Sequence, residues 1–572
     1  MKFDLSRYTL DCFFAKVLEK YPTRPALAVV GEIPFSYAEF GEKVNHLRNK
    51  LYEAGIRKGS RVAILGNSSP HWGIAFLSIT TLGAIAVPIM EDFPDTDIDH
   101  ILRHSEAESI FISQNLLETL SLPAIDYLNF VINLQDFEFI RKPHPEEKNM
   151  WSKLQDIPGK ILKTRDNAPV LPQKFECQDI EEDDIAEILY TSGTTGHSKG
   201  VMLTHRNLVS NLFEGPDLLG VIDENSVILS FLPLAHAFGS TSAFLSIIYC
   251  GASICYLNRK PSPKILMEAM QLVKPTIIGA VPLIFEKIYH KRVLPVITEK
   301  RMLRILTKSH LGRKLVYRKA GEKIMESFGG RLKCAIIGGA SLNREVEMFL
   351  RTGGIPYAMG YGLSECSPLV AFSSIEGVRI GSVGQPINDV EIKILDPNPK
   401  TGVGEILTKG PNVMKGYYKN EQETRKVFTE DGWFITGDRG YLDKDGYLYI
   451  KGRSKNVIIE ASGENIYPEV IEEKLKESLF VEEALVHMSG NELIARIYPD
   501  YEYIRTLEEG KEENAIASDI LRILEDVRLE TNRKLPPTSK IQKIFEQAEP
   551  FVKTPTNKIK RAEYIPDYLS GY

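Results

Sequence analysis

The sequence predicts an α/β protein with a large N-terminal domain of parallel sheets covered by helices, a β-rich lobe, and a small α+β C-terminal domain. Three observations predict this class. The 572 residues exceed what one hydrophobic core supports, so several domains are expected. Short β-rich runs alternate with helical patterns in the N-terminal half, which is typical of βαβ units. Between residues 376 and 450, short β-runs are separated by D-P, G-P and D-G turn signals instead, and the pattern changes again after Gly452.

The N-terminal domain begins with a clear helix signal. Ser36 and Glu39 have the S-x-x-E spacing of a capping box. Apolar residues then recur at helical spacing from Phe40 to Leu51, and Gly55 ends the run. We therefore expect a helix that begins after Ser36 and buries one face.

A buried strand is predicted at Arg61 to Gly66, and a second strand near Ala84 to Ile89. An apolar helix lies between them, so the two strands are expected to pair in parallel. Trp72 to Met90 is apolar and long enough to be considered as a membrane span. Its glycines and proline favour a buried helix and strand. Ala243 to Leu257 is shorter and broken by Gly251, so we interpret it as core as well.

Two more β-rich runs, Pro275 to Pro282 and Leu332 to Ala340, are each followed by a helical pattern and extend the βαβ rhythm. Residues 141–185 are charged and contain proline, which favours a surface loop over much of that stretch. Asp500 to Asn514 is predicted to be a charged surface excursion.

Composition narrows the function classes. The net charge is −6, which gives no electrostatic footprint for nucleic acid, so no nucleic-acid partner is expected. The N-terminus lacks the features of a signal peptide, and no transmembrane segment is expected. The six cysteines form no C-x-x-C pair, so neither a disulfide framework nor a zinc site is expected. Reduced thiols fit a cytoplasmic protein, and peripheral contact with the inner face of a membrane stays open.

The segment Tyr190 to Gly200, YTSGTTGHSKG, has the chemistry of a phosphate-binding loop. Its glycines let backbone N–H groups approach an anion, while hydroxyls and Lys199 add donors and positive charge. It is not a Walker A loop, because His197 and Ser198 separate Gly196 from the lysine. A flexible linker is the alternative, but a linker rarely follows a hydrophobic strand directly.

This loop resembles the signature of the adenylate-forming superfamily, which includes acyl-CoA synthetases, luciferases and peptide-synthetase adenylation domains. Five further segments resemble the other motifs of that superfamily, in the expected order and over nearly the whole chain. They are Phe231 to Gly239 (FLPLAHAFG), Met359 to Glu365 (MGYGLSE), Trp433 to Asp438 (WFITGD), Ile450 to Glu472 (IKGRSKNVIIEASGENIYPEVIE) and Lys553 to Arg561 (KTPTNKIKR).

The resemblance implies ATP, Mg²⁺ and CoA as cofactor and cosubstrates, and a role for each matched residue. Ser364 corresponds to the residue whose hydroxyl touches the α-phosphate. Glu365 corresponds to the Mg²⁺ ligand and is also assigned to catalysis. A carboxylate oxygen suits such a hard cation. The β- and γ-phosphates would be held by the loop residues Thr191, Ser192, Gly193, Thr194, Thr195, Gly196 and Lys199. Thr191 is also assigned to catalysis.

The nucleoside is expected to contact four further residues. Tyr361 corresponds to the aromatic residue that stacks on adenine, and Gly339 is assigned to the same nucleotide site. Asp438 resembles the carboxylate that binds the ribose hydroxyls, assisted by Arg453. An Asp after Thr-Gly is otherwise a common turn or cap residue.

The acyl group and the catalytic lysine complete the predicted site. Lys558 resembles the C-terminal lysine that reaches the substrate carboxylate and the bridging α-phosphate oxygen; a solvated lysine is the alternative. His236 and Gly338 are assigned to the acyl tunnel. For His236, a hydrogen-bonded structural histidine remains the other interpretation.

Two departures from the family pattern are present. Asn557 stands where glycine commonly precedes the catalytic lysine, and asparagine also tolerates a left-handed backbone. Ser364 replaces the commoner threonine and keeps the hydroxyl. Long-chain fatty acyl-CoA synthetases often lack that glycine, and Val281 to Lys291 and Arg331 to Arg351 resemble the same branch. A medium- or long-chain aliphatic acid is therefore the expected substrate.

The resemblance implies two half-reactions, which form an acyl-adenylate and then an acyl-CoA thioester. It also implies that a mobile C-terminal domain, residues 456–572, rotates on the N-terminal domain, residues 1–452, about a hinge at residues 453–455. Lys455 would be the hinge residue, and the loop with Gly463 would replace Lys558 in the second step. A solvated lysine in a turn is the alternative for Lys455.

Three other functions stay open. An acyl carrier protein could accept the acyl group in place of CoA, and the acid could be an aryl or amino acid. A catalytically inactive binding module is the third, although Lys199, Glu365, Asp438 and Lys558 argue against it.

Overall fold

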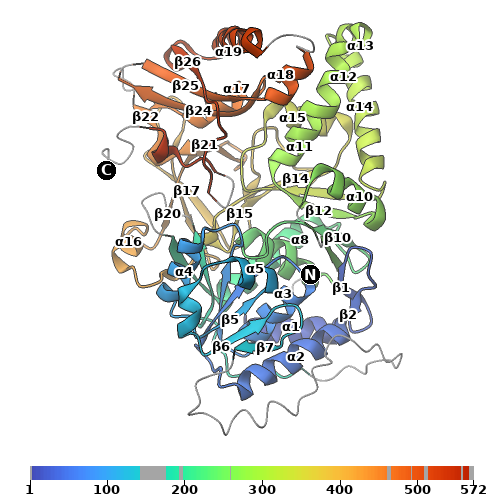
Figure 1. The fold of residues 1–572 in the computed structure, drawn as a ribbon, viewed down its shortest axis with the longest axis vertical. Helices are drawn as coiled ribbons and strands as arrows, with labels where there is room; N and C mark the ends of the chain where they lie inside the picture. Colours follow the sequence, from blue (N-terminus) through green and yellow to red (C-terminus); the bar gives the residue numbers. More distant parts are fainter. Residues whose placement is uncertain are drawn as a thin grey trace.

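The computed structural model describes residues 3–141, 175–191, 198–257, 259, 261–459, 465–490, 492–507, 513–554 and 558–565. Its two largest sheets are mainly parallel and alternate with helices along the chain, so the predicted α/β class is confirmed. Figure 1 shows the blue N-terminal elements at one end of the molecule and the red C-terminal strands and helices at the other. Most of the predicted loop at 141–185 lies outside the described residues.

The predicted capping box begins α2 (Tyr37–Glu53). The Glu39 N–H donates to Ser36 Oγ over 3.2 Å, and the Ser36 N–H donates back to Glu39 Oε2 over 2.6 Å. The helix buries Phe40, Val44 and Leu51 on one face. The chain leaves the helix through Gly55, whose φ of +95° favours glycine.

The predicted strand–helix–strand unit is confirmed in the first large sheet. β3 (Arg61–Leu65) and β4 (Ile85–Ile89) pair in parallel, and α3 (Pro70–Thr80) connects them. α3 is buried almost all round, which explains its uniformly apolar sequence. Among the described residues, no helix is long and apolar enough to cross a membrane.

The first sheet has eight strands. Its order is β19 (Gly416–Tyr417), β9 (Lys199–Thr204), β8 (Ile185–Thr191), β4, β3, β5 (Ser109–Ile112), β6 (Phe130–Asn133) and β7 (Phe139–Arg141). The helices that follow its central strands are α4 (Asp95–His104), α5 (Gln114–Thr119) and the 3-10 turn η1 (Pro123–Tyr127).

The second sheet has nine strands, and both other predicted β-runs form parallel strands within it, at β12 and β13. Its order is β16 (Gln385–Pro386), β15 (Leu369–Phe372), β14 (Tyr357–Gly362), β13 (Cys334–Ile337), β12 (Ile277–Ala280), β10 (Val227–Ser230), β11 (Ser253–Tyr256), β1 (Pro25–Val29) and β2 (Phe35–Ser36).

The remaining helices of the N-terminal part include two π-helical turns, η3 (Phe238–Leu245) and η4 (Tyr289–Val293). The others are α1 (Leu10–Lys20), α7 (His205–Leu212), α8 (Glu214–Leu219), α9 (Ser246–Tyr249), α10 (Pro263–Val273), α11 (Pro282–Ile288), α12 (Leu294–Glu299), α13 (Arg301–Leu306), α14 (His310–Ser327), α15 (Arg344–Gly353) and the 3-10 turn η5 (Ser364–Cys366).

One apolar core joins the two large sheets. It contains Ile64 of β3 and Ile254 of β11 together with Trp72 and Phe76 of the buried helix α3. The segment 243–257 also lies in the interior, as part of η3, α9 and β11. The two sheets are therefore fixed relative to each other by packing.

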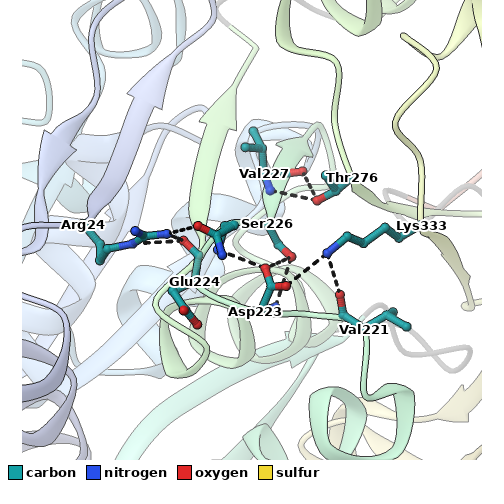
Figure 2. A network of polar contacts seen from close by, with 9 residues as sticks. Arg24, Val221, Asp223, Glu224, Ser226, Val227, Thr276 and Lys333 are labelled. Atoms are coloured by element: carbon teal, nitrogen blue, oxygen red, sulfur yellow. Dashed lines mark hydrogen bonds and ion pairs between the residues drawn. The ribbon is translucent and has the colours of Figure 1, made fainter.

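A polar network fixes the entrance to β10 (Figure 2). Lys333 Nζ lies 3.1 Å from Asp223 Oδ2, and Arg24 donates to the backbone carbonyl of Glu224 over 2.5 Å. The hydroxyl of Thr276 accepts the N–H of the first residue of β10 over 2.9 Å. Arg24, Thr276 and Lys333 stand directly before β1, β12 and β13, so they hold the same loop and align the amino ends of neighbouring strands.

The region 376–450 is β-rich but divides its strands between sheets. β17 (Glu391–Leu395), β18 (Gly404–Lys409), β20 (Phe434–Leu442) and β21 (Leu448–Arg453) form an antiparallel four-stranded sheet. β16 and β19 join the two large sheets instead, and α16 (Glu421–Lys426) is helical.

The C-terminal part begins with the 3-10 turn η6 (Ser454–Asn456) and the short pair β22 (Ile458–Ile459) and β23 (Asn465–Ile466). Its main sheet contains β24 (Val481–Ser489), β25 (Glu492–Pro499) and β26 (Lys543–Glu546), and its helical elements are α17 (Pro468–Leu475), α18 (Tyr501–Leu507), α19 (Glu513–Lys534), η7 (Pro537–Ser539) and η8 (Arg561–Glu563). The predicted excursion at 500–514 is partly helical, because Ile504 of α18 packs into the core of this part.

Candidate functional site

A large cleft of about 2740 Å³ brings together predicted site residues from distant parts of the chain. Both large sheets, the four-stranded sheet and the C-terminal part contribute to its walls. The predicted residues that line it are Thr191, Lys199, His236, Gly338, Gly339, Tyr361, Ser364, Glu365, Asp438, Arg453, Lys455 and Lys558. Ser192, Gly193, Thr194, Thr195 and Gly196, together with Gly463 and Asn557, lie outside the described residues.

The two ends of the predicted phosphate loop are held as a β-pair. Thr191 ends β8 and lies opposite Lys199, which begins β9. Lys199 Nζ lies 2.5 Å from Glu423 Oε2 on α16 and 5.1 Å from the centre of the Tyr417 ring. The lysine therefore points into the cleft with a carboxylate as its partner, which an anionic ligand could replace.

The same tyrosine reaches the predicted metal ligand. The Tyr417 hydroxyl donates to Glu365 Oε1 over 3.0 Å, and the Glu365 carbonyl accepts the Met414 N–H over 2.8 Å. Glu365 lies on η5, directly after β14, with a half-buried side chain. Its carboxylate is thus oriented toward the side of the cleft that contains Lys199.

Asp438 connects the predicted nucleoside residues. Asp438 and Arg453 are cross-strand partners of β20 and β21, and Arg453 Nε lies 2.8 Å from Asp438 Oδ1. The Tyr361 hydroxyl donates to the other oxygen, Oδ2, over 2.7 Å. Asp438 is only 6% exposed, and burial together with this carboxylate raises the pKa of Tyr361 well above its usual value.

Two lysines, Lys455 and Lys558, line the cleft close to Arg453. Burial, with Arg453, Lys558 and Arg561 nearby, lowers the pKa of Lys455 to about 8. Desolvation and Arg453 lower the pKa of Lys558 as well, against the opposite effect of Asp438 and Glu365. Lys558 destabilises the charged form of Lys455, and Arg453 destabilises the charged form of both lysines, effects that a bound anion would reverse.

The part of the cleft that is predicted to hold the acyl group contains Phe238, the first residue of the π-helix η3. A Cβ atom added to Gly338 would lie 3.3 Å from the Gly360 carbonyl and 3.7 Å from the Phe238 ring, so a larger side chain there would crowd both groups. His236 Nδ1 accepts the Phe238 N–H over 3.3 Å, and burial lowers the pKa of His236 to about 4. His236 is therefore neutral near pH 7.

The residues fit ATP and Mg²⁺ by their chemistry. Lys199, Arg453, Lys455 and Lys558 converge on one cleft, as a polyphosphate requires, and Glu365 supplies the carboxylate oxygen that Mg²⁺ prefers. Sequence reasoning missed Glu423, Tyr417 and Phe238. Glu423 is 224 residues from Lys199, and no pattern around it marks the contact.

Comparison with known proteins agrees with this geometry. The profile of the family described as AMP-binding enzyme matches residues 14–418. FadD15 of Mycobacterium bovis, a long-chain-fatty-acid–CoA ligase, is 30% identical over 477 residues, covering 78% of this chain and 74% of that protein. AEE15 of Arabidopsis thaliana, a chloroplastic long-chain-fatty-acid–[acyl-carrier-protein] ligase, is 27% identical over 620 residues, covering 96% and 84%.

Solved structures share the fold. ATP-bound MatB from Rhodopseudomonas palustris superposes with a TM-score of 0.72 at 22% identity, over 97% of this chain and 98% of that one. O-succinylbenzoate coenzyme A synthetase from Bacillus subtilis, in complex with ATP and magnesium ion, gives a TM-score of 0.70 at 23% identity, over 96% and 98%. With the profile match covering most of the sequence, the chain belongs to the AMP-binding enzyme family.

Proposed function

We propose that the protein activates a medium- or long-chain fatty acid with ATP and transfers the acyl group to CoA, giving acyl-CoA, AMP and pyrophosphate. One observation carries the proposal: Lys558, Glu365 and Asp438, from three distant parts of the chain, line one cleft that also has apolar walls. The likeness to a long-chain-fatty-acid–CoA ligase supports the choice of acid.

The first half-reaction is an attack by a carboxylate oxygen of the acid on the α-phosphorus of ATP. The bond to the bridging oxygen breaks, and pyrophosphate leaves with the electron pair. Lys558 and Lys199 stabilise the negative charge on the phosphate oxygens. Asp438 and Arg453 hold the ribose, and Tyr361 contacts the adenine. Mg²⁺, held by Glu365, would neutralise phosphate charge when bound.

In the second half-reaction the CoA thiol loses its proton, its sulfur attacks the acyl carbon, and AMP leaves. We propose that the chain performs both steps by rotating residues 456–572 on residues 1–452 about the hinge at 453–455. Lys558 lines the cleft, which is the arrangement that the first step requires.

The acyl chain is proposed to extend along the apolar walls beyond Gly338. This end of the cleft is lined by Phe231, Phe238, Met267, Met270, Ile278 and Ile336. Burial of each methylene contributes about 0.8 kcal/mol, so longer acids gain affinity until the walls end.

Pyrophosphate release with Mg·ATP tests the proposal. The purified protein is assayed with straight-chain acids of increasing length and with aryl and amino acids. The highest kcat/KM is expected for medium or long chains. A preference for an aryl or amino acid would reject the fatty-acid assignment.

A carrier-protein acceptor is the second candidate, favoured by the likeness to an acyl-carrier-protein ligase over 96% of this chain. Free CoA and a phosphopantetheinylated carrier protein are compared as acceptors for preformed acyl-AMP. If the thioester forms faster with the carrier protein, the carrier protein is the acceptor in place of CoA.

A further inference from the structure

A strongly basic surface lies at one end of the molecule. We define the basic tip as residues 300–323, which include α13 and most of α14. Figure 1 shows α12, α13 and α14 close together at one end of the molecule, with α13 at its edge. Residues 300–323 contain nine lysines and arginines and one acidic residue, Glu322, in a chain whose net charge is −6.

Large apolar side chains of the basic tip are exposed. The exposed fraction is 71% for Met302, 59% for Ile305, 79% for Leu311 and 59% for Leu315. Met302 and Ile305 are three residues apart on one helix, and Leu311 and Leu315 four apart on the next, so each pair shares a helix face. Exposed apolar residues that cluster in this way indicate a contact surface.

The helix behind this surface is held firmly by its other face. Val316, Tyr317 and Ala320 pack against the apolar core. A Cβ atom added to Gly321 would lie 2.1 Å from the Gly353 carbonyl, so α14 and α15 meet backbone to backbone. The exposed leucines therefore belong to a packed helix.

The positive charges of the basic tip are not neutralised within the described part of the chain. There, Lys300, Arg304, Lys308, Lys314 and Lys319 form no ion pair. Lys287 and Lys291, earlier in the same helical region, pair instead with Glu482 at 3.9 Å and Glu502 at 2.9 Å. The surplus charge creates a positive potential that attracts an anionic surface.

We propose that the basic tip docks the protein on an anionic lipid bilayer. Interfacial helices combine lysine and arginine with apolar side chains that enter the headgroup and acyl boundary. A nucleic acid would match the charge but leave the leucines in water. The fluid acyl region accepts separate apolar side chains without a matching pocket. The large cleft also reaches Arg292 of η4 and Pro295 in the first turn of α12, so docking would bring this end of the cleft to the membrane.

Cosedimentation of the full chain with vesicles tests the proposal. Vesicles of mixed phosphatidylglycerol and phosphatidylcholine are compared with phosphatidylcholine alone, at low and high salt. The protein is expected to bind the anionic vesicles, less so at high salt. Each basic residue near the surface contributes about fivefold in partitioning, so the triple variant K308Q, K314Q, K319Q should lose about 100-fold.

Two further variants complete the test. The matched triple variant K400Q, K444Q, K540Q removes three exposed lysines elsewhere and should bind as the parent does. Leu311→Ser with Leu315→Ser should lose about tenfold or more. Pyrophosphate release with a soluble acid should stay unchanged in all three, which checks folding. Equal binding of the parent to both vesicle types would overturn the proposal. Unaltered vesicle binding by K308Q, K314Q, K319Q would also overturn it. So would a basic tip that binds an acidic carrier protein but does not bind vesicles.

Discussion

Three other cations lie near Lys455, and their charge makes the protonation of Lys455 sensitive to a bound anionic ligand. Burial and the nearby Arg453, Lys558 and Arg561 lower its pKa to about 8. Below pH 8, Lys455 is already protonated in the free cleft. Above that pH it is neutral, and a bound polyphosphate would favour the charged form and raise the pKa again.

We therefore expect ATP binding to take up a proton above about pH 8. The affinity should fall as the pH rises, by up to about tenfold per pH unit for one linked proton. Isothermal titration calorimetry in buffers of different ionisation enthalpy measures the proton uptake. Lys455→Arg keeps the charge at every accessible pH and should remove much of the uptake, because arginine does not titrate there. Equal uptake by the parent and by this variant would assign the proton to another group.

Lys558→Ala should abolish adenylation and largely spare thioester formation. Removing one well-placed donor to developing charge costs on the order of 10²–10³ in rate. Single-turnover pyrophosphate release measures the first step, and preformed acyl-AMP with CoA measures the second. Equal damage to both steps would contradict the assignment of Lys558.

Motif residues could be predicted from the sequence, and their partners could not. Twelve predicted residues line the cleft, since each belongs to a segment with a recognisable pattern. Glu423 and Tyr417 reach Lys199 only because β19 joins the first sheet beside β9. This placement depends on tertiary packing, which a local pattern does not encode.

Elements were predictable where local and tertiary preferences agree. The capping box of α2 and the apolar sequence of α3 determine helices that the core also requires. The region 376–450 shows the opposite case. Its turn signals predict short strands, but β16 and β19 pair outside the four-stranded sheet, since strand pairing depends on neighbours that are distant in the sequence.

A buried ion pair attaches the segment that contains Lys558 to α17. Arg561 Nη2 lies 2.6 Å and 2.5 Å from the two carboxylate oxygens of Glu472, and both side chains are 11% exposed. Glu472 Oε1 also accepts the Val486 N–H of β24 over 2.7 Å. This contact fixes residues 558–561 on the C-terminal sheet.

Arg561→Ala should therefore destabilise the C-terminal part by about 3–5 kcal/mol, because it leaves a buried carboxylate without its partner. Amide hydrogen exchange of α17 and β24 measures the loss. The double variant R561A, E472Q removes the uncompensated charge and keeps an acceptor for Val486, so it should recover part of the stability. If the double variant is no more stable than Arg561→Ala, the ion pair is not the cause.

At the scale of the whole molecule, polar contacts connect the C-terminal part to the rest. Lys291 lies 2.9 Å from Glu502, Lys287 lies 3.9 Å from Glu482, and Asn343 Nδ2 donates to the Glu473 carbonyl over 3.5 Å. Exposed ion pairs of this kind contribute about 0–1 kcal/mol each. Breaking them would oppose a domain rotation only weakly.

Lys455→Pro should separate the two half-reactions if the chain pivots at this residue. Lys455 lies in the turn η6, between Arg453 of β21 and Val457. Hinges are a few such element ends that absorb a backbone change, and proline fixes φ near −65°. Acyl-AMP should still form and accumulate on the protein, while thioester formation falls steeply. Single-turnover assays measure both steps, circular dichroism checks folding, and Lys455→Ala controls for the lost side chain. A folded proline variant that slows both steps equally, or neither, would place the pivot elsewhere.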